Sequence, residues 1–240
     1  MLTQQMMSDG LSCEEARARI WLFDVNGLLE STRKDLADFQ RPYAHRHAPT
    51  KDFVASIESI KPGAIIGVST VAKAFNQQVI EAMARVNERP IIFPYSNPTS
   101  HLECTAEEAY RWSEGRAIFA SGSPFPPVRF GDRTFVPGQG NNVYIFPAIG
   151  LAVYATRAKR ITDEMFIAAA DAVAEQVTEA ELAIGLVYPP QSTILKTELH
   201  AAQRVAEVIF ARGLAQVERP KDIAWFVESQ TYQAQYQPLV

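Results

Sequence analysis

The fold is decided by residues 64–86, which read AIIGVSTVAKAFNQQVIEAMARV. Residues 64–68 form a short continuous apolar run, which is typical of a strand buried in a parallel sheet. Ser69 and Thr70 follow as a turn of small polar residues, and a helical pattern then extends over residues 74–86. This order of strand, turn and helix predicts one βα unit of an α/β sheet.

Other apolar runs predict further strands, at residues 20–23, 90–93 and 117–120. The earliest run reads as a buried parallel strand that ends at Asp24, and Asn26-Gly27 follows it as a turn signal. A dinucleotide-binding fold places its ribose-binding carboxylate at the carboxyl end of such a strand. An Asp after a strand is more often a turn residue, so the sequence leaves both interpretations of Asp24 open.

Small polar residues follow three of the predicted strands. They are Ser69-Thr70, Ser96-Asn97-Pro98-Thr99 and Ser121-Gly122-Ser123. Open α/β sheets bind ligands beyond the carboxyl ends of their strands. An Asn-Pro pair alone indicates only a turn, but the repetition after successive strands favours a ligand-binding edge.

A further polar motif, Gly138-Gln139-Gly140-Asn141-Asn142, precedes an apolar helix expected over residues 142–158. Two glycines permit a tight turn or the close approach of a ligand to the backbone. Asn residues are good helix caps, so one interpretation is a turn with an N-cap. The other is a polar cluster that holds a small ligand at the start of a helix.

Helix signals account for much of the remaining chain. Ser12 with Glu15, and Thr105 with Glu108, have the spacing of capping boxes. The bend Gly131-Asp132 predicts a hairpin over residues 128–135. Further helices are expected over residues 1–19 with a break at Asp9-Gly10, and over residues 52–60, 105–112, 163–177, 192–212 and 222–230.

These elements predict an α/β protein with a Rossmann-like parallel sheet, helices on both of its faces and a helical C-terminal tail. We expect the βα units to occupy about residues 1–160 and the helical extension about residues 161–240.

Composition and charge exclude several classes of protein. The formal net charge is −4 and the chain has no concentrated basic stripe, which argues against a nucleic-acid partner. Two cysteines cannot form a disulfide framework, and the chain is expected to be cytoplasmic, with a mitochondrial location still open. No apolar run reaches membrane-spanning length, so no membrane partner is expected.

Two other kinds of site are weighed against the sheet edge. His45 and His47 are spaced as a metal-binding pair, but no Cys, Asp or Glu sits at ligand spacing beside them, which favours a solvated loop. Cys104 and His101 would suit a cysteine hydrolase, but no third orienting group is evident and the surrounding residues fit a helix cap.

Several groups of residues recur in an order and spacing that together form a family pattern. They are Trp21-Leu22-Phe23-Asp24 with Gly27-Leu28, Asn87-Glu88-Arg89-Pro90 with Ser96-Asn97-Pro98-Thr99, Glu103-Cys104-Thr105-Ala106-Glu107, Phe119-Ala120-Ser121-Gly122-Ser123-Pro124-Phe125, Pro137-Gly138-Gln139-Gly140-Asn141-Asn142, and Tyr188-Pro189-Pro190. The combination resembles the NAD-binding domain of malic enzymes over almost the whole of residues 1–240. Malic enzymes decarboxylate malate oxidatively to pyruvate.

The resemblance implies a role for each matching residue. Asp24 matches the acid that hydrogen-bonds the adenosine ribose, and a carboxylate there repels the 2′-phosphate of NADP. Gln40 stands where NAD-preferring members tend to carry Gln and NADP-preferring members Lys. The resemblance therefore implies NAD as the cofactor, with NADP possible.

Further implied contacts lie at the strand ends. Asn97 matches a residue near the nicotinamide and the malate carboxylate, Asn142 a second substrate contact and Asn141 its cofactor-side neighbour. Val68 and Ser69 occupy the cofactor-contacting turn after the strand at 64–68, although this turn lacks the family's glycine. Neutral carboxamides can hold a carboxylate and an alcohol without adding charge near the hydride acceptor.

Other parts of the family pattern have no match in this chain. These are the Gly-x-Gly-x-x-Gly/Ala loop with its first strand, the acid–base tyrosine and lysine, and the carboxylates that bind Mg²⁺ or Mn²⁺ in the complete enzyme. We therefore expect no catalytic residue and no metal ligand here, and no turnover of malate by this chain alone. The alternative is a non-catalytic nucleotide-binding module or truncated paralogue. For the complete enzyme the resemblance implies a homo-oligomer.

Overall fold

The sheet that residues 64–86 begin is four-stranded and parallel throughout. A computed structural model describes residues 1–232. The strands are β3 (Ala64–Gly67), β4 (Ile91–Pro94), β5 (Ile118–Ser121) and β8 (Gly138–Gln139), in the spatial order β3-β4-β5-β8. In the register, Ile65 pairs with Ile92, Ile92 with Phe119 and Ala120 with Gly138. The predicted α/β class with a parallel sheet is confirmed.

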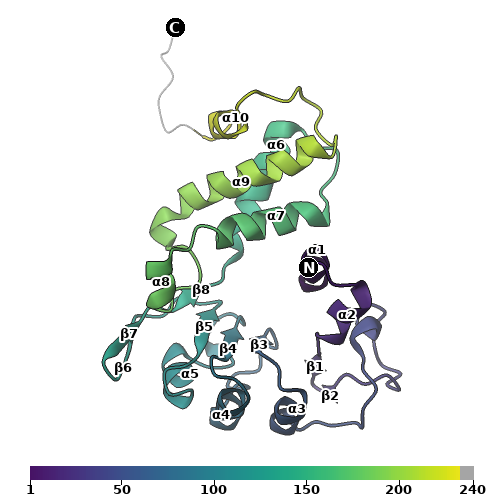
Figure 1. The fold of residues 1–240 in the computed structure, drawn as a ribbon, viewed down its shortest axis with the longest axis vertical. Helices are drawn as coiled ribbons and strands as arrows, with labels where there is room; N and C mark the ends of the chain where they lie inside the picture. The colour runs from purple at the N-terminus through teal and green to yellow at the C-terminus, as the bar shows by residue number, and fades with distance from the viewer. Residues whose placement is uncertain (233–240) are drawn as a thin grey trace. The chain divides into compact units, whose positions relative to one another are not determined.

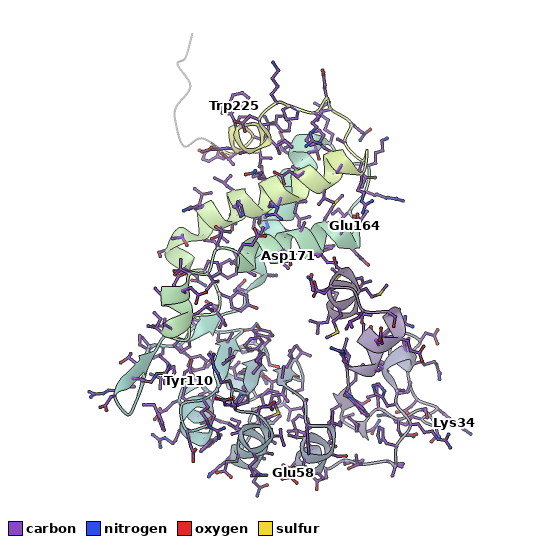
Figure 2. The ribbon with its side chains drawn as sticks, viewed as in Figure 1. Lys34, Glu58, Tyr110, Glu164, Asp171 and Trp225 are labelled. Carbon is purple, nitrogen blue, oxygen red and sulfur yellow. The ribbon has the colours of Figure 1, made fainter. Side chains whose placement is uncertain are left out.

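Three helices lie side by side along one face of this sheet (Figure 1), namely α3 (Phe53–Ile60), α4 (Gln77–Val86) and α5 (Ala106–Trp112). Between sheet and helices lies an apolar core that includes Ile65, Ile92, Phe119 and Met83. Tyr110 of α5, labelled in Figure 2, is fully buried there and stacks on Phe135 with ring centroids 4.3 Å apart. The core thus fixes the strands whose ends carry the polar turns.

The capping box predicted at Thr105 is confirmed, and Asp52 provides a further cap that the sequence pattern did not predict. The side chain of Asp52 accepts a hydrogen bond from Ala55 N at the start of α3, and Thr105 forms a complete capping box with Glu108 at the start of α5. α4 begins at Gln77 rather than at residue 74, because Asn76 caps it by accepting from Val79 N.

The prediction of a buried parallel strand at residues 20–23 is wrong. Phe23 is exposed and lies in β1 (Phe23–Asp24), which pairs antiparallel with β2 (Gly27–Leu28) outside the main sheet. The turn signal accounts for this, since Gly27 adopts φ +111° and a Cβ there would overlap the carbonyl group of Thr50. The chain folds back at once instead of extending into the sheet.

Short helices flank this hairpin. They are α1 (Leu2–Ser8), α2 (Cys13–Ala18) and the 3₁₀ helix η1 (Arg41–Tyr43). The predicted break at Asp9-Gly10 and the Ser12–Glu15 capping box are confirmed. Aromatic rings connect the hairpin to the core. The ring centroids of Phe23 and Phe53 are 4.9 Å apart, and those of Phe53 and Phe75 are 6.1 Å apart.

Only the first two residues of the motif at residues 138–142 form a strand, and its last residue begins a 3₁₀ helix. Gly138–Gln139 form β8 at one edge of the sheet, so the sheet has a strand that the pattern did not predict. Asn142 begins the 3₁₀ helix η3 (Asn142–Tyr144), and the long helix α6 (Phe146–Thr156) starts only at Phe146. A two-residue strand has too few side chains to show alternation, which explains why the sequence pattern did not predict it.

The chain divides into two compact units. The first comprises Met1–Asn141 and Thr178–Tyr188, and it includes the 3₁₀ helix η2 (Thr99–His101), the predicted hairpin β6 (Val128–Phe130) and β7 (Arg133–Phe135), and α8 (Glu179–Ala183). The second begins at Asn142 and resumes at Pro189. The boundary expected at about residue 160 falls inside this second unit.

The second unit is helical, and α9 (Ile194–Ala211) is its central element. α6, α7 (Asp163–Ala174) and α10 (Ile223–Ser229) contact α9, and η4 (Gln191–Thr193) precedes it. Small residues on the buried face of α9, Ala201, Ala202 and Ala206, allow close helix packing. None of the helices in residues 1–232 is both long and apolar enough to cross a membrane.

Candidate functional site at the carboxyl edge of the sheet

The polar turns after β3, β4, β5 and β8 meet because parallel strands end at the same edge of a sheet. Thr70 N donates to Ser96 Oγ at 2.9 Å, which joins the β3 and β4 turns. Ser123 Oγ donates to Asn97 Oδ1 at 3.2 Å, which joins the β4 and β5 turns. Gly140 N donates to Ser121 O at 2.9 Å and attaches β8 to β5. The structure thus connects the turns that carry Ser69, Asn97 and Asn141.

A buried glutamate holds the first two of these turns. Glu103 is fully buried, and its Oε1 accepts from Ser69 N at 3.0 Å, Ser69 Oγ at 3.0 Å and Ser96 Oγ at 2.6 Å. Gly67 makes room for it, since a Cβ at this position would overlap the Glu103 carboxyl group. Glu103 therefore sets the place of the β3 turn against the β4 turn.

Glu103 belongs to one of the sequence motifs, but the sequence pattern predicted no role for it. One signal was available: an acid stands between Leu102 and Cys104, both of which are buried. A buried carboxylate needs hydrogen-bond donors around it, and here they come from Ser69, 34 residues away in the sequence, and from Ser96, seven residues away.

Asn97 is exposed at this edge, three residues beyond the end of β4. Its side-chain oxygen accepts from Ser123, so the carboxamide has a fixed direction. Gly122 lies directly against it: a Cβ there would be 2.6 Å from Tyr95 O and 3.0 Å from Asn97 Nδ2. Only a residue without a side chain lets the β5 turn approach so closely.

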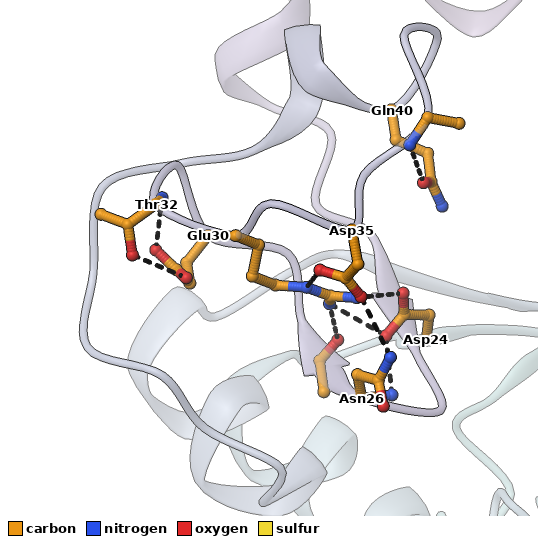
Figure 3. A network of polar contacts seen from close by, with 9 residues as sticks. Asp24, Asn26, Glu30, Thr32, Asp35 and Gln40 are labelled. Carbon is orange, nitrogen blue, oxygen red and sulfur yellow. Dashed lines mark hydrogen bonds and ion pairs between the residues drawn. The ribbon is translucent and has the colours of Figure 1, made fainter.

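Asp24 and Arg33 form a second polar cluster, on the β1–β2 segment (Figure 3). The guanidinium group binds both Asp24 oxygens, at 3.0 and 2.7 Å, and both Asp35 oxygens, at 3.0 and 2.8 Å. Hydrogen bonds from Arg33 lower the pKa of Asp24, and they lower the pKa of Asp35 to about 2. Asn26 N also donates to Asp24 Oδ1 at 2.8 Å, so Asp24 is a turn residue as well as an ion-pair partner.

The other predicted contact residues are placed separately. Gln40 belongs to a local turn, in which its side-chain oxygen accepts from Ala37 N at 2.9 Å (Figure 3). Val68 is 74% exposed just beyond β3, where a ligand can reach it. Asn142 is exposed and is the first residue of the second unit.

The two alternative sites do not have the features that their chemistry needs. Cys104 is fully buried, and burial raises the pKa of its thiol, so it is not a reactive thiolate. His45 Nε2 lies 2.9 Å from Ile20 O and its ring stacks on Trp21, while His47 Nε2 lies 3.0 Å from Leu29 O. Both histidines thus have structural contacts. Within residues 1–232, no three His, Cys, Asp or Glu side chains are grouped as metal ligands.

Solved structures of malic enzymes have a fold similar to that of this chain. A crystal structure of malic enzyme from Entamoeba histolytica has a TM-score of 0.71 and 23% sequence identity, covering 95% of this chain and 44% of that one. Malic enzyme from Pyrococcus horikoshii Ot3 has a TM-score of 0.61 and 26% identity, covering 85% of this chain and 43% of that one. The first likeness shows the fold alone.

Sequence relatives are more similar. An NADP-dependent malic enzyme of Vitis vinifera is 50% identical over 234 residues, which are 96% of this chain and 40% of that protein. NADP-dependent malic enzyme 3 of Arabidopsis thaliana is 48% identical over 229 residues, or 95% and 39% of the two chains. This chain therefore spans about 40% of the length of the curated relatives that it matches.

The family described as malic enzyme, NAD binding domain, matches residues 1–210. These residues include the whole polar edge of the sheet and the Asp24–Arg33 cluster. The chain therefore belongs to the malic enzyme NAD-binding domain family.

Proposed function

We propose that this chain holds the nicotinamide cofactor and malate for oxidative decarboxylation to pyruvate and CO₂. The observation that carries the proposal is the joined set of neutral polar turns at the carboxyl ends of β3, β4, β5 and β8. Such an edge is where open α/β sheets bind nucleotides. Together with the family membership, this favours a cofactor and substrate site over an unrelated binding role.

The donor set fits a dinucleotide and a dicarboxylic acid. Asn97 presents a carboxamide whose oxygen accepts from Ser123, so its N–H groups suit a substrate carboxylate or the nicotinamide carbonyl. Ser69 and Val68 are exposed beside it for cofactor contact, and Asn141 follows Gly140 at the end of β8. The nicotinamide supplies the hydride acceptor, and these residues contribute binding and orientation.

We propose NAD as the preferred cofactor, with Asp24 bound to the adenosine ribose. Charge supports this assignment, because one guanidinium group of Arg33 faces the two carboxylates of Asp24 and Asp35. The cluster keeps a net negative charge and would repel a 2′-phosphate. The cited relatives are named NADP-dependent, so this choice needs a direct comparison of both nucleotides.

Calorimetry of the full chain with NAD and with NADP tests the proposal. Saturable binding that is tighter for NAD is expected, and Asn97→Ala should weaken it while Gln78→Ala, an exposed carboxamide on α4, should not. Asp24→Asn should narrow the difference between the two nucleotides. An absence of binding to either nucleotide would contradict the proposal.

An assay of the same sample with malate, NAD and Mn²⁺ separates the enzyme from its alternative. Formation of NADH assigns turnover to this chain. Saturable binding without turnover assigns it the role of a nucleotide-binding module, which is the alternative function.

A further inference from the structure

Gly138 in β8 and Gly140 just after it face two tyrosine rings. Gly138 and Gly140 are two residues apart, so their Cα hydrogens point to the same face of the strand. A Cβ at Gly138 would lie 3.4 Å from Tyr188 Cδ2, and a Cβ at Gly140 would lie 2.6 Å from Tyr95 Cε1. Neither glycine has the positive φ that favours glycine. The absent side chain of Gly140 therefore provides the space that the Tyr95 ring fills, whereas a Cβ at Gly138 would make close contacts with Val187 and Tyr188 without overlapping them.

The rings of Tyr95 and Tyr188, here called the tyrosine pair, are joined at their tips. Their hydroxyl oxygens are 2.8 Å apart, which is a hydrogen bond between residues far apart in the sequence. Phe93 packs against Tyr95 with ring centroids 5.5 Å apart. Burial raises the pKa of Tyr95, so its hydroxyl group stays protonated and the hydrogen bond persists across the physiological pH range.

Tyr95 is also fixed through its backbone. Its N–H group donates to Gly67 O at 2.7 Å, at the end of β3. Its carbonyl oxygen lies against Gly122 after β5, where a Cβ would come within 2.6 Å. One residue thus contacts β3 and β5 through its main chain and β8 through its ring.

The two carboxamides proposed to hold the nicotinamide side lie next to these contacts. Asn97 follows Tyr95 by two residues, and Asn141 follows Gly140 directly. A shift of the Tyr95 ring relative to Gly140 would change the spacing of Asn97 and Asn141. Ligand binding and catalysis depend on such spacing, since misplacing a binding group by about 1 Å can lower the reaction rate by up to about a hundredfold.

We propose that Tyr95 is a positioning residue of the nucleotide site. The tyrosine pair packs against Gly138 and Gly140, and it sets the spacing between Asn97 and Asn141 that binds a nicotinamide dinucleotide. Gly138 and Gly140 pack against these rings and do not form a phosphate-binding loop. This inference rests on the proposed cofactor site for its ligand, but its structural part can be tested without any ligand.

The ligand test is a double-mutant cycle between Tyr95 and Gly140 in the full chain. Gly140→Ala introduces a Cβ beside the ring, and we expect NAD affinity to fall about tenfold. Tyr95→Leu removes the ring and its positioning contacts, so it should also lower NAD affinity. The double variant should lose clearly less than the product of the two single losses, because leucine leaves room for the new methyl group. Tyr95→Phe, which removes only the hydroxyl group, should lower affinity about threefold.

Gly150→Ala is the matched control, because a Cβ there meets no atom within 4 Å. It should leave NAD affinity unchanged. Circular dichroism of each variant below its unfolding transition shows whether the folded population is complete. A purely structural role would lower the melting temperature without changing the affinity of the folded protein. Equal affinity for wild type and Gly140→Ala, or additive losses in the double variant, would overturn the proposal.

Hydrogen exchange tests the structural part. The Gly140 amide is bonded to Ser121 O at 2.9 Å, so it should be protected in the wild type. Faster exchange at this amide is expected in Gly140→Ala and Tyr95→Phe, with no change at the amides of α4. Unchanged exchange would contradict the positioning role. If the wild type binds no nucleotide, the proposed function fails, and the exchange result still decides the role of the tyrosine pair.

Discussion

Two polar clusters in the first unit have opposite designs. Asp24, Arg33 and Asp35 form a charged cluster in which every partner lies within nine residues, and Asp35 keeps 52% of its side-chain surface exposed. Glu103 has no exposed surface, and it binds neutral donors at Ser69 and Ser96. The Asp24 cluster is local and ionic and is partly exposed to water. The Glu103 cluster joins separate turns through buried hydrogen bonds.

This contrast indicates what each cluster contributes. Exposed ion pairs gain little free energy, because water and salt screen them and their side chains lose entropy. Buried polar groups are costly to leave unpaired, so removing one partner has a large effect. We therefore expect the Glu103 cluster to determine the stability of the sheet edge and the Asp24 cluster to influence ligand choice and pH response.

Glu103→Ala should have the largest effect. It leaves Ser69 N–H and the hydroxyl groups of Ser69 and Ser96 without their shared acceptor, and it opens a cavity. We expect the free energy of unfolding to fall by about 3 kcal/mol, measured by urea denaturation. Glu107→Ala on the exposed side of α5 is the control and should cost about 0.5 kcal/mol or less. Similar losses in both variants would erase the distinction between the clusters.

Gly67→Ala tests the same cluster from the other side. The added Cβ would overlap the carboxyl group of Glu103, whose side chain is fully buried. Overpacking of this kind should lower the free energy of unfolding by about 2 kcal/mol. Gly63→Ala serves for comparison, because nothing lies within 4 Å of the Cβ it would introduce. The melting temperature of Gly67→Ala should be clearly lower than that of Gly63→Ala. Equal melting temperatures would contradict close packing between Gly67 and Glu103.

Arg33→Lys should have a smaller effect that depends on salt. A lysine ammonium group cannot bind two carboxylates side by side as the planar guanidinium group does. We expect a loss of about 1 kcal/mol in dilute buffer, which shrinks in 1 M NaCl because exposed charges are screened. Denaturation at both salt concentrations measures the difference. A loss that is independent of salt would place this cluster with the buried one.

The pH response of Asp35 is the most local of the four effects. Its pKa is lowered from 3.8 to about 2, chiefly by hydrogen bonds from Arg33. A lowered folded-state pKa stabilises the protein above pH 4, and this contribution is lost as the pH falls through about 2. An NMR titration of the Asp35 carboxyl carbon should show that Arg33→Gln returns the pKa toward its ordinary value. An unchanged titration would show that Arg33 does not cause the shift.

Short-range signals in the sequence predicted the structure well. The capping boxes at Ser12 and Thr105 and the bend at Gly131-Asp132 were predicted, because their hydrogen bonds join residues within a few positions. The central strands were predicted from their continuous apolar runs. Errors arose where a distant partner decided the outcome. β8 became a strand because β5 lies beside it, and residues 20–23 left the sheet because Gly27 fits against Thr50.

The candidate site followed the same rule. The sequence pattern predicted polar residues at three strand ends, and the structure joins these turns through Thr70–Ser96 and Ser123–Asn97. The supporting residues Glu103 and Tyr95 could not be identified, because Glu103 binds Ser69 across 34 residues of sequence and Tyr95 binds Tyr188 across 93. The roles of Asp24, Gln40, Asn97, Asn141 and Asn142 in ligand binding stay predictions until binding is measured.

The discontinuity of the first unit has a consequence for the order of folding during synthesis. Ile184 O accepts a hydrogen bond from Val136 N at 2.8 Å, and Tyr188 meets Tyr95, yet both residues are made after residues 142–177, which belong to the other unit. A nascent chain ending before Thr178 would therefore lack the last segment of this unit. Domains usually mature in the order in which they leave the ribosome. Here the first unit must wait for a segment made later, so its sheet edge is completed only after Tyr188 has been translated.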